Sequence, residues 1–316
     1  MATGRISCKF RQAVIETRGH TIDTDTDTNA QGWTDRTWQS PDGLTLYFRD
    51  YAGGAVTDRP PIICMHGLTR NARDFAELAE RLAGEWRVIV PDMRGRGESD
   101  YADDAATYNP LVYVQDVEAL LEQEGIDRFV AIGTSMGGLM TMMLAMIDAD
   151  RIAGAVLNDI GPEIDPAGLD RIKNYVGQSR SYPSWMHAAR ALMDVHQPSH
   201  PTFTIDDWLA MAKRNMSVQQ NGRIGFDYDM SIAEPFNTAD GAAPPDLWPA
   251  LEALAGRPVL LIRGALSDLF SPSTMEDMHR RLPGSVMATI PEVGHAPLLT
   301  EADAVSAIDA FLRKLA

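Results

Sequence analysis

The stretch of sequence that decides the fold is FVAIGTSMGG, residues 129–138. Its first four residues are apolar and predict a buried strand, while the apolar run that begins at Met136 predicts a helix. Between them lies GTSMG, residues 133–137, which has the pattern Gly-x-Ser-x-Gly. In a strand–turn–helix of this kind, small flanking residues permit a tight turn that exposes the serine oxygen above the end of the sheet. We therefore predict that Ser135 is a nucleophile.

On both sides of this turn, short apolar runs alternate with amphipathic stretches. This pattern is typical of a mostly parallel central sheet with helices on both faces, so the predicted fold class is α/β. The predicted strands are residues 44–48, 61–65, 87–90, 129–132, 152–157, 259–262 and 286–290. The predicted helices are residues 72–82, 111–123, 136–147, 274–281 and 302–315.

The alternation stops in residues 161–245, where Pro and Gly are frequent. Two helical stretches in this segment, residues 188–195 and 205–216, follow one another without an intervening strand. The pattern favours an inserted helical cap. The α/β core would then consist of residues 32–160 and 246–316.

Residues 1–31 are polar and lack apolar partners, which favours a mobile tail. The acidic stretch that begins at Asp23 resembles a calcium loop only superficially. An EF-hand loop needs Gly at its sixth position and Glu at its twelfth, and those positions hold Thr28 and Thr34. We therefore predict no metal site here.

Composition narrows the class of protein. With 316 residues, of which 45% are hydrophobic, the chain can form a single domain with one insertion. Its formal net charge of −16 disfavours nucleic acid and anionic membranes as partners. The two cysteines, Cys8 and Cys64, exclude a disulfide framework and favour a reducing compartment. Since no stretch is typical of a signal peptide or a membrane span, we predict a soluble, cytoplasmic protein.

The GTSMG turn and its surroundings resemble the nucleophile elbow of the α/β-hydrolase superfamily, and the resemblance covers the chain outside the tail and the cap. A second match is MHGL, residues 65–68, because a strand that ends in His-Gly precedes one N–H group of the oxyanion hole in that family. The resemblance implies that the backbone N–H groups of Leu68 and Met136 bind the developing oxyanion. A third match is PDMRGRGESD, residues 91–100, which resembles the loop after the next strand.

A serine hydroxyl needs a base to accept its proton and a group that orients this base. Of the seven histidines, His295 lies just past the last predicted strand, where the family order of Ser, acid and His places the base. Asp268 follows the strand at 259–262 in a loop that resembles the acid-bearing loop of the family, and it is the predicted acid. Asp159 follows the preceding strand and remains the alternative, because some family members carry the acid there.

The candidate substrate contacts are His66 and Gly67, beside the oxyanion strand, and Trp185 and Trp208 in the cap. His66 is more typical of a residue that braces a loop than of a catalytic one. Most aromatic and Met side chains of the cap are expected to form its own core.

Three arginines are the evident groups that could hold a carboxylate: Arg70 after the oxyanion strand, and Arg171 and Arg190 in the cap. Because arginines in amphipathic helices usually face solvent, we expect these side chains on exposed faces. An uncharged ester should then be preferred over an anionic substrate of similar size.

These residues predict a serine hydrolase that cleaves a small-molecule carboxylic ester through an acyl-enzyme intermediate, without metal or cofactor. Ser at the elbow argues against the haloalkane dehalogenase and epoxide hydrolase branches, which use Asp. A lactonase remains an alternative. So does a C–C bond hydrolase of aromatic degradation, although that branch typically has Asn and Trp where this chain has Thr134 and Ala296. A catalytically silent receptor on the same fold is the non-enzymatic alternative. Acyl transfer to an alcohol and the oligomeric state stay open.

Overall fold

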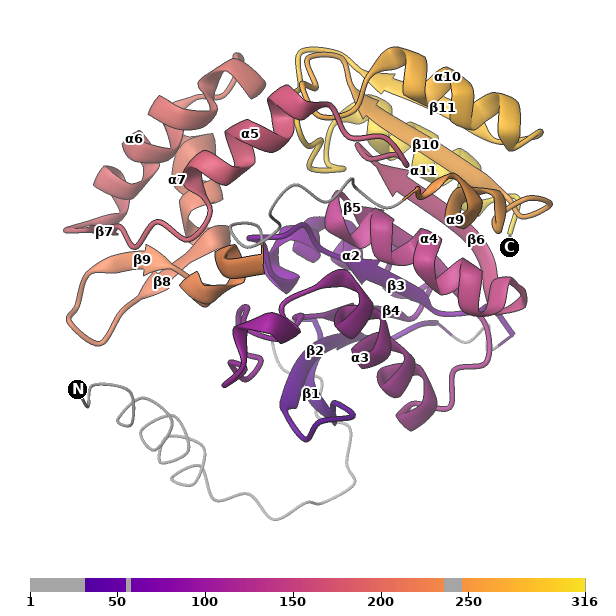
Figure 1. The fold of residues 1–316 in the computed structure, drawn as a ribbon, viewed down its shortest axis with the longest axis horizontal. Coiled ribbons are helices and arrows are strands. Elements are labelled where there is room, and N and C mark those ends of the chain that lie inside the picture. The colour runs from indigo at the N-terminus through magenta and orange to yellow at the C-terminus, as the bar shows by residue number, and fades with distance from the viewer. Residues whose placement is uncertain (1–31, 55–57, 236–245, 316) are drawn as a thin grey trace.

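A computed structural model of the chain describes residues 32–54, 58–235 and 246–315. The predicted mobile tail, residues 1–31, lies outside the described residues, as does the last part of the predicted cap. Figure 1 shows a large sheet with helices packed against it and a smaller group of elements on one side.

The large sheet has eight strands in the order β1-β2-β4-β3-β5-β6-β10-β11. Strands β1 and β2 form antiparallel pairs at one edge, and all other neighbouring strands are parallel, which confirms the predicted mostly parallel sheet. The strands are β1 (Thr34–Gln39), β2 (Thr45–Tyr51), β3 (Ile62–Met65), β4 (Val88–Pro91), β5 (Phe129–Thr134), β6 (Ile152–Asn158), β10 (Val259–Gly264) and β11 (Val286–Ile290). Only β1 was not among the predicted strands, and it is a half-exposed edge strand with few apolar residues.

Helices cover both faces of this sheet, as predicted (Figure 1). One hydrophobic core lies between the sheet and a first set of helices: α3 (Pro110–Gln123), α4 (Met136–Asp148), α9 (Trp248–Glu252) and α10 (Pro272–Arg281). A second core lies on the opposite face under α2 (Ala76–Leu82) and α11 (Ala302–Leu312). The short 3₁₀ helices of this part are η1 (Ala72–Phe75), η2 (Ala105–Thr107) and η3 (Ala149–Arg151).

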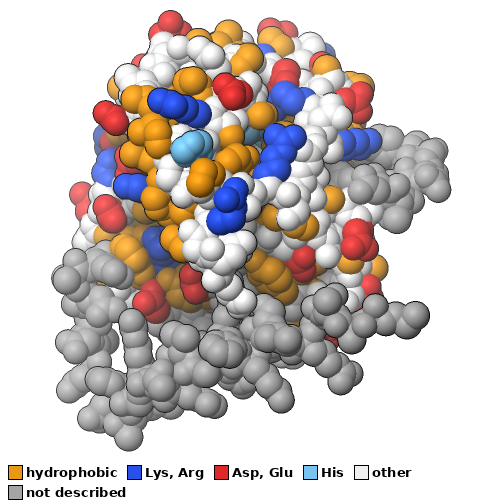
Figure 2. Space-filling view, turned by 90° about the vertical axis from the view of Figure 1, so that its left-hand side faces the viewer, with side chains coloured by type: hydrophobic (Ala, Val, Ile, Leu, Met, Phe, Trp, Pro, Cys, Tyr) orange, Lys and Arg blue, Asp and Glu red, His pale blue; other side chains and the backbone are white. Residues whose placement is uncertain are grey.

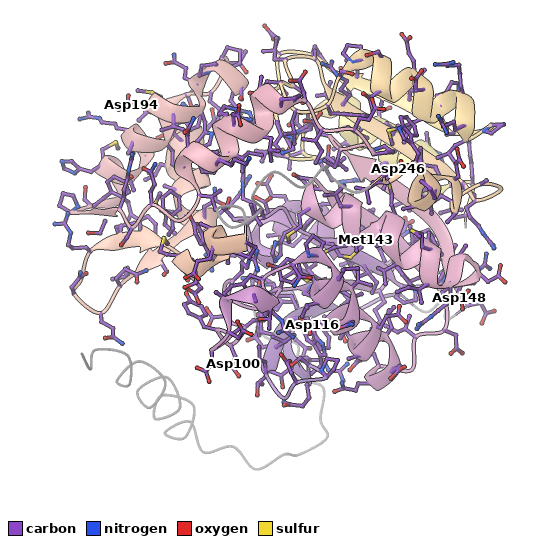
Figure 3. All side chains as sticks on the ribbon, in the orientation of Figure 1. Asp100, Asp116, Met143, Asp148, Asp194 and Asp246 are labelled. Carbon is purple, nitrogen blue, oxygen red and sulfur yellow. The ribbon has the colours of Figure 1, made fainter. Side chains whose placement is uncertain are left out.

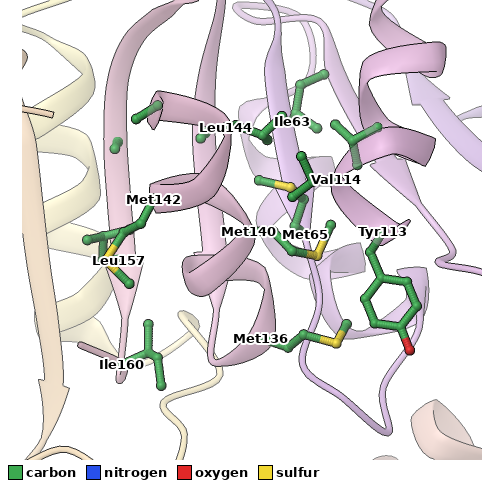
Figure 4. Close-up of a cluster of buried hydrophobic side chains, with 14 of the residues drawn as sticks. Ile63, Met65, Tyr113, Val114, Met136, Met140, Met142, Leu144, Leu157 and Ile160 are labelled. Carbon is green, nitrogen blue, oxygen red and sulfur yellow. The ribbon is translucent and has the colours of Figure 1, made fainter. Parts of the chain in front are cut away.

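The first core fixes the position of α4 on the sheet. In Figure 4, Met136 and Met140 on α4 point toward Met65 on β3 and toward Val114 and Tyr113 on α3. These five side chains are at most 5% exposed. Because α4 begins directly after Ser135, its packing also fixes the turn that carries this serine.

A buried ion pair holds the loop after β4. Asp116, on α3 and labelled in Figure 3, accepts hydrogen bonds from Arg94 Nε (2.7 Å) and Nη2 (2.6 Å). Both side chains are at most 1% exposed, so each compensates the charge of the other in an apolar environment. The pair therefore ties the loop of residues 92–97 to the main core.

The segment between β6 and β10 forms a separate layer over the end of the sheet (Figure 1). Here we call its described part, residues 161–235, the cap. Its helices are α5 (Pro166–Tyr175), α6 (Trp185–His196), α7 (Ile205–Asn215), η4 (Gln197–Ser199) and η5 (Met230–Ala233). The described cap is mostly helical, but the expected helical insertion also contains a small antiparallel sheet, which brings together a segment before α6 and two segments after α7. The strand order in this sheet is β7 (Ser181–Tyr182), β9 (Ile224–Phe226) and β8 (Met216–Val218).

Backbone hydrogen bonds attach the cap to the core. Gly97 N–H donates to Asp227 O (3.1 Å), and Asp229 N–H donates to Gly95 O (2.8 Å). The Asp227 carboxylate also accepts a hydrogen bond from Arg73 Nη2 (2.6 Å). These hydrogen bonds hold the cap above the carboxyl ends of the parallel strands.

The outer face of the cap mixes exposed apolar side chains with basic ones, as Figure 2 shows.

Candidate active site

Ser135 lies in a strained turn between β5 and α4. Its φ of 51° is positive, a value that residues other than glycine rarely adopt. A Cβ atom at Gly133 would lie 2.3 Å from Gly137 O, and one at Gly137 would lie 2.0 Å from Met65 O. Both glycines are therefore required because backbone from the helix and from β3 occupies the space of a side chain.

We expect Gly137→Ala to reduce the free energy of unfolding by about 3 kcal/mol, the upper part of the range typical of overpacking. The added methyl group collides with the Met65 carbonyl, so α4 must move away from β3. Urea denaturation followed by circular dichroism measures the change. The matched control is Met146→Ala on the same helix, which removes a side chain that is 60% exposed and should change stability by less than about 0.5 kcal/mol. Equal stability of the two variants would contradict the packing argument.

Three residues from different strand ends form a continuous hydrogen-bonded chain. His295 Nε2 lies 2.9 Å from Ser135 Oγ, and His295 Nδ1 lies 2.7 Å from Asp159 Oδ2. Ser135 follows β5, Asp159 follows β6, and His295 follows β11. The carboxyl ends of parallel strands lie at one edge of the sheet. Asp159 and Ser135 therefore meet His295 there, although they precede it by 136 and 160 positions in the chain.

The Asp159 carboxylate is fully buried and accepts three hydrogen bonds. Gly264 N–H donates to Oδ1 (2.8 Å), Ser267 Oγ–H donates to Oδ2 (2.7 Å), and His295 Nδ1 is the third partner. An ionised carboxylate can only accept, so Nδ1 must carry the proton. His295 Nε2 is then free to accept the proton of Ser135.

The structure does not place Asp268 on His295, so the predicted pairing of these two residues was wrong. The Asp268 carboxylate instead accepts hydrogen bonds from Arg171 Nε (2.5 Å) and Nη2 (2.8 Å), on cap helix α5. This guanidinium lowers the pKa of Asp268 below its usual value. Strands β6 and β10 are neighbours, so the residue after either strand can approach the histidine. Spacing along the chain could not decide between the two.

The peptide between Gly67 and Leu68 has a fixed orientation. Gly67 O accepts from Arg70 N–H (3.1 Å) and lies 2.7 Å from His66 Nδ1. In a trans peptide the C=O and N–H groups point in opposite directions, so the Leu68 N–H points away from these donors. Leu68 and Ser135 line the same pocket. Met136 is the first residue of α4, where the N–H groups have no acceptor within the helix.

His66 is fully buried and is not part of the pocket, so its predicted contact with substrate was wrong. Its Nε2 accepts a hydrogen bond from Met93 N–H (3.1 Å), which requires that Nδ1 donates to Gly67 O. Burial lowers the pKa of His66 to about 3, so the ring is neutral at physiological pH. His66 holds the Gly67–Leu68 peptide against the loop after β4.

The pocket above Ser135 is formed by the loop after β3, the loop of His295 and the cap. Of the candidate substrate contacts, Gly67 lines this pocket, but Trp185 and Trp208 do not. Trp208 is fully buried in the core of the cap, and Trp185 packs against that core, because both helices turn their large side chains toward each other. The cap contributes a different set of lining residues: Ile172, Tyr175, Leu192, His196, Met211, Asn215, Phe226 and Tyr228.

The three arginines occupy different environments. Arg190 is exposed, as expected. Arg70, with a side chain only 20% exposed, lines the pocket, and Arg171 is bound to Asp268, so the expectation of exposed faces was wrong for these two. Arg70 lies in a loop beside Ser135 and not in an amphipathic helix, which is why the helix argument did not apply to it.

The described residues contain neither a candidate metal site nor a candidate membrane-spanning helix. Among residues 32–54, 58–235 and 246–315, no group of three or more His, Cys, Asp or Glu side chains is placed to hold a metal ion. In the same part of the chain, no helix is long and apolar enough to cross a membrane.

Comparison with known proteins gives consistent similarities. Residues 60–302 match a family model described as alpha/beta hydrolase fold. The chain is 34% identical over 247 residues to a 3-hydroxybutyrate-oligomer hydrolase from Cupriavidus necator, covering 76% of this chain and 84% of that protein. It is 26% identical over 252 residues to a 2-(acetamidomethylene)succinate hydrolase from Mesorhizobium japonicum, covering 80% and 85%.

Solved structures show the same similarity. A crystal structure of an alpha/beta hydrolase from Novosphingobium aromaticivorans superimposes with a TM-score of 0.86 at 55% sequence identity. It covers 90% of this chain and 99% of that one.

Proposed function

Because the chain belongs to the α/β-hydrolase family, we propose that it hydrolyses carboxylic esters through an acyl intermediate on Ser135. The observation that carries this proposal is the hydrogen-bonded chain Ser135–His295–Asp159, with distances of 2.9 and 2.7 Å. A serine in a strained turn, a base within hydrogen-bond reach and a buried acid that orients this base are the parts that acyl transfer requires. A silent receptor would not need this geometry.

In the first half of the reaction, Ser135 Oγ attacks the ester carbonyl carbon while His295 Nε2 accepts the hydroxyl proton. The carbonyl oxygen becomes an oxyanion, which the N–H groups of Leu68 and Met136 stabilise. The carbon–oxygen bond to the alcohol then breaks, and His295 transfers its proton to the leaving oxygen. The products of this half are an alcohol and an ester of Ser135.

In the second half, a water molecule attacks the acyl carbon and gives a proton to His295 Nε2. A second oxyanion forms in the same place and collapses, and the proton returns to Ser135 Oγ as the acid leaves. In both halves the ionised Asp159 stabilises the imidazolium form of His295. The hydrogen bonds from Gly264 and Ser267 keep Asp159 in place during these steps.

The names of the relatives support ester chemistry in general and an oligomeric hydroxyacyl ester in particular. The relative from Cupriavidus necator is named a 3-hydroxybutyrate-oligomer hydrolase. Such oligomers contain ester bonds and end in a carboxylate, and their short aliphatic units fit a pocket with apolar walls such as Ile172, Leu192 and Met211. We propose short hydroxyacyl esters as the first substrates to test.

The experiment is hydrolysis of a panel by the purified protein: p-nitrophenyl esters, a linear 3-hydroxybutyrate trimer, an aliphatic lactone and a vinylogous diketone acid. We expect turnover of the two ester classes at rates that exceed those of the lactone and the diketone acid. Faster turnover of the lactone or of the diketone acid would contradict the proposal in favour of a lactonase or a C–C bond hydrolase. Absence of turnover for all four would favour the receptor alternative.

A further inference from the structure

Arg70 lies beside the nucleophile. A Cβ atom added at Gly67 would lie 3.6 Å from Arg70 Cγ and 3.7 Å from Ser135 Cβ, so the two side chains lie on either side of the same small space. Arg70 follows the proposed oxyanion residue Leu68 by two positions, and all four residues line the same pocket. A group that reached the Arg70 guanidinium would therefore belong to a substrate whose ester carbonyl is a few bonds away.

Only one of the three guanidinium nitrogens of Arg70 has a partner among the described residues. Nη1 donates to Asp74 Oδ1 (3.0 Å) and to Asn215 Oδ1 (3.5 Å). Within the described chain, Nε and Nη2 have no such acceptor. These two nitrogens form the edge of the guanidinium that binds a carboxylate with two parallel hydrogen bonds.

Other arginines of this chain show how that edge is normally used. Three of them bind a carboxylate through Nε and Nη2 together, at 2.5–3.0 Å: Arg87 with Asp50, Arg94 with Asp116, and Arg171 with Asp268. Arg70 is about as shielded as Arg171, with side chains 20% and 24% exposed. The Nε–Nη2 edge of Arg70 is thus as shielded from solvent as the edge of Arg171, which forms an ion pair, but no carboxylate of the described residues is bound to it.

The other titratable side chains that line the pocket are neutral or already paired, so Arg70 carries the charge that a substrate could reach. Asp74 is 9% exposed and already paired with Nη1. Burial, with the field of Arg70 as the next cause, lowers the pKa of His196 to about 3, so this ring is neutral. Burial raises the pKa of Tyr175 and raises that of Tyr228 to about 12, so both stay neutral phenols. His295 is engaged with Ser135 and Asp159.

We propose that the Nε–Nη2 edge of Arg70 binds a free carboxylate of the substrate, so that the protein prefers esters that carry an acid group a few bonds from the scissile carbonyl. This inference rests on the proposed esterase function and names its substrate class. It reverses the preference for uncharged esters that was expected from the sequence. Asn215 lines the same pocket, and its Oδ1 accepts a hydrogen bond from Arg70 Nη1 and not from the Nε–Nη2 edge.

The test compares two aryl esters of matched shape. One is the mono-p-nitrophenyl ester of adipic acid, which carries a carboxylate, and the other is p-nitrophenyl 6-methylheptanoate, in which an isopropyl group replaces it. We expect the wild type to prefer the anionic ester in kcat/KM. Arg70→Gln should lower kcat/KM for the anionic ester by about 10- to 100-fold, mainly through KM, as loss of a charge-assisted bidentate contact predicts. For the neutral ester the change should stay below about 3-fold.

Two variants and one pair of inhibitors separate charge recognition from damage to the pocket. Arg190→Gln removes an exposed arginine of the cap and should leave kcat/KM unchanged for both esters. Arg70→Lys keeps the charge but not the paired donors, and should recover only part of the preference. In the wild type, adipate should inhibit competitively while 1,6-hexanediol does not, a comparison that stays informative if Arg70→Gln fails to fold.

Each negative result has its own meaning. Equal losses for both esters in Arg70→Gln, or equal inhibition by adipate and the diol, would overturn the carboxylate site while leaving the esterase proposal in place. If the wild type hydrolysed neither ester and adipate did not bind, the esterase proposal itself would fail and the inference with it.

Discussion

Ser135→Ala is expected to lower kcat for an activated ester by about 10⁴-fold or more, while the protein stays folded. In the proposed mechanism the hydroxyl oxygen of Ser135 forms the acyl bond, and no other serine of the described residues is hydrogen-bonded to His295 Nε2. Alanine is smaller and fits the strained turn, so the circular dichroism spectrum and the urea midpoint should remain close to those of the wild type. Steady-state hydrolysis of p-nitrophenyl butyrate measures the loss.

Covalent labelling supplies the independent check on this result. A fluorophosphonate should modify one residue of the wild type, and peptide mass spectrometry should locate the adduct on Ser135. The Ser135→Ala variant should not be labelled. An adduct on another serine, together with retained activity of Ser135→Ala, would show that the nucleophile lies elsewhere.

Asp159→Asn is expected to reduce kcat by about 10⁴-fold, the loss known for the equivalent change in a catalytic triad. The amide can still accept from Gly264, but its NH₂ group would face both Ser267 Oγ and His295 Nδ1, where the carboxylate accepts. The histidine would then favour the tautomer with the proton on Nε2, which cannot accept a proton from Ser135.

Asp268→Asn is the matched comparison, because it makes the same chemical change at the residue after the neighbouring strand. Its carboxylate pairs with Arg171 on the cap and has no hydrogen bond to His295, so we expect kcat to fall less than about 10-fold. Both variants should be tested as folded proteins with the same aryl ester. A larger loss for Asp268→Asn than for Asp159→Asn would return the role of the acid to Asp268.

Local patterns in the sequence were sufficient for much of the fold. The strand, the GTSMG turn and the following helix are consecutive in the chain, and their conformations depend on steric demands within a few residues, such as the contact of Gly133 with Gly137 O. The parallel sheet was also predictable, because each short apolar run is a local pattern that indicates a buried strand. The pattern of apolar runs did not predict β1 at the sheet edge, because this half-exposed strand contains few apolar residues. In the cap it missed the small sheet, whose strands have only two or three residues.

What the sequence by itself determined is therefore the α/β-hydrolase fold, the turn that carries Ser135 and the position of His295 after the last strand. Only the tertiary structure decided which acid contacts this histidine, because β6 and β10 lie side by side and either loop can turn inward. It also decided that His66 and Trp208 are buried supports and that Arg70 faces the pocket. These outcomes depend on partners distant in the chain, such as Met93 for His66 and Asn215 for Arg70, and a one-dimensional pattern does not contain such contacts.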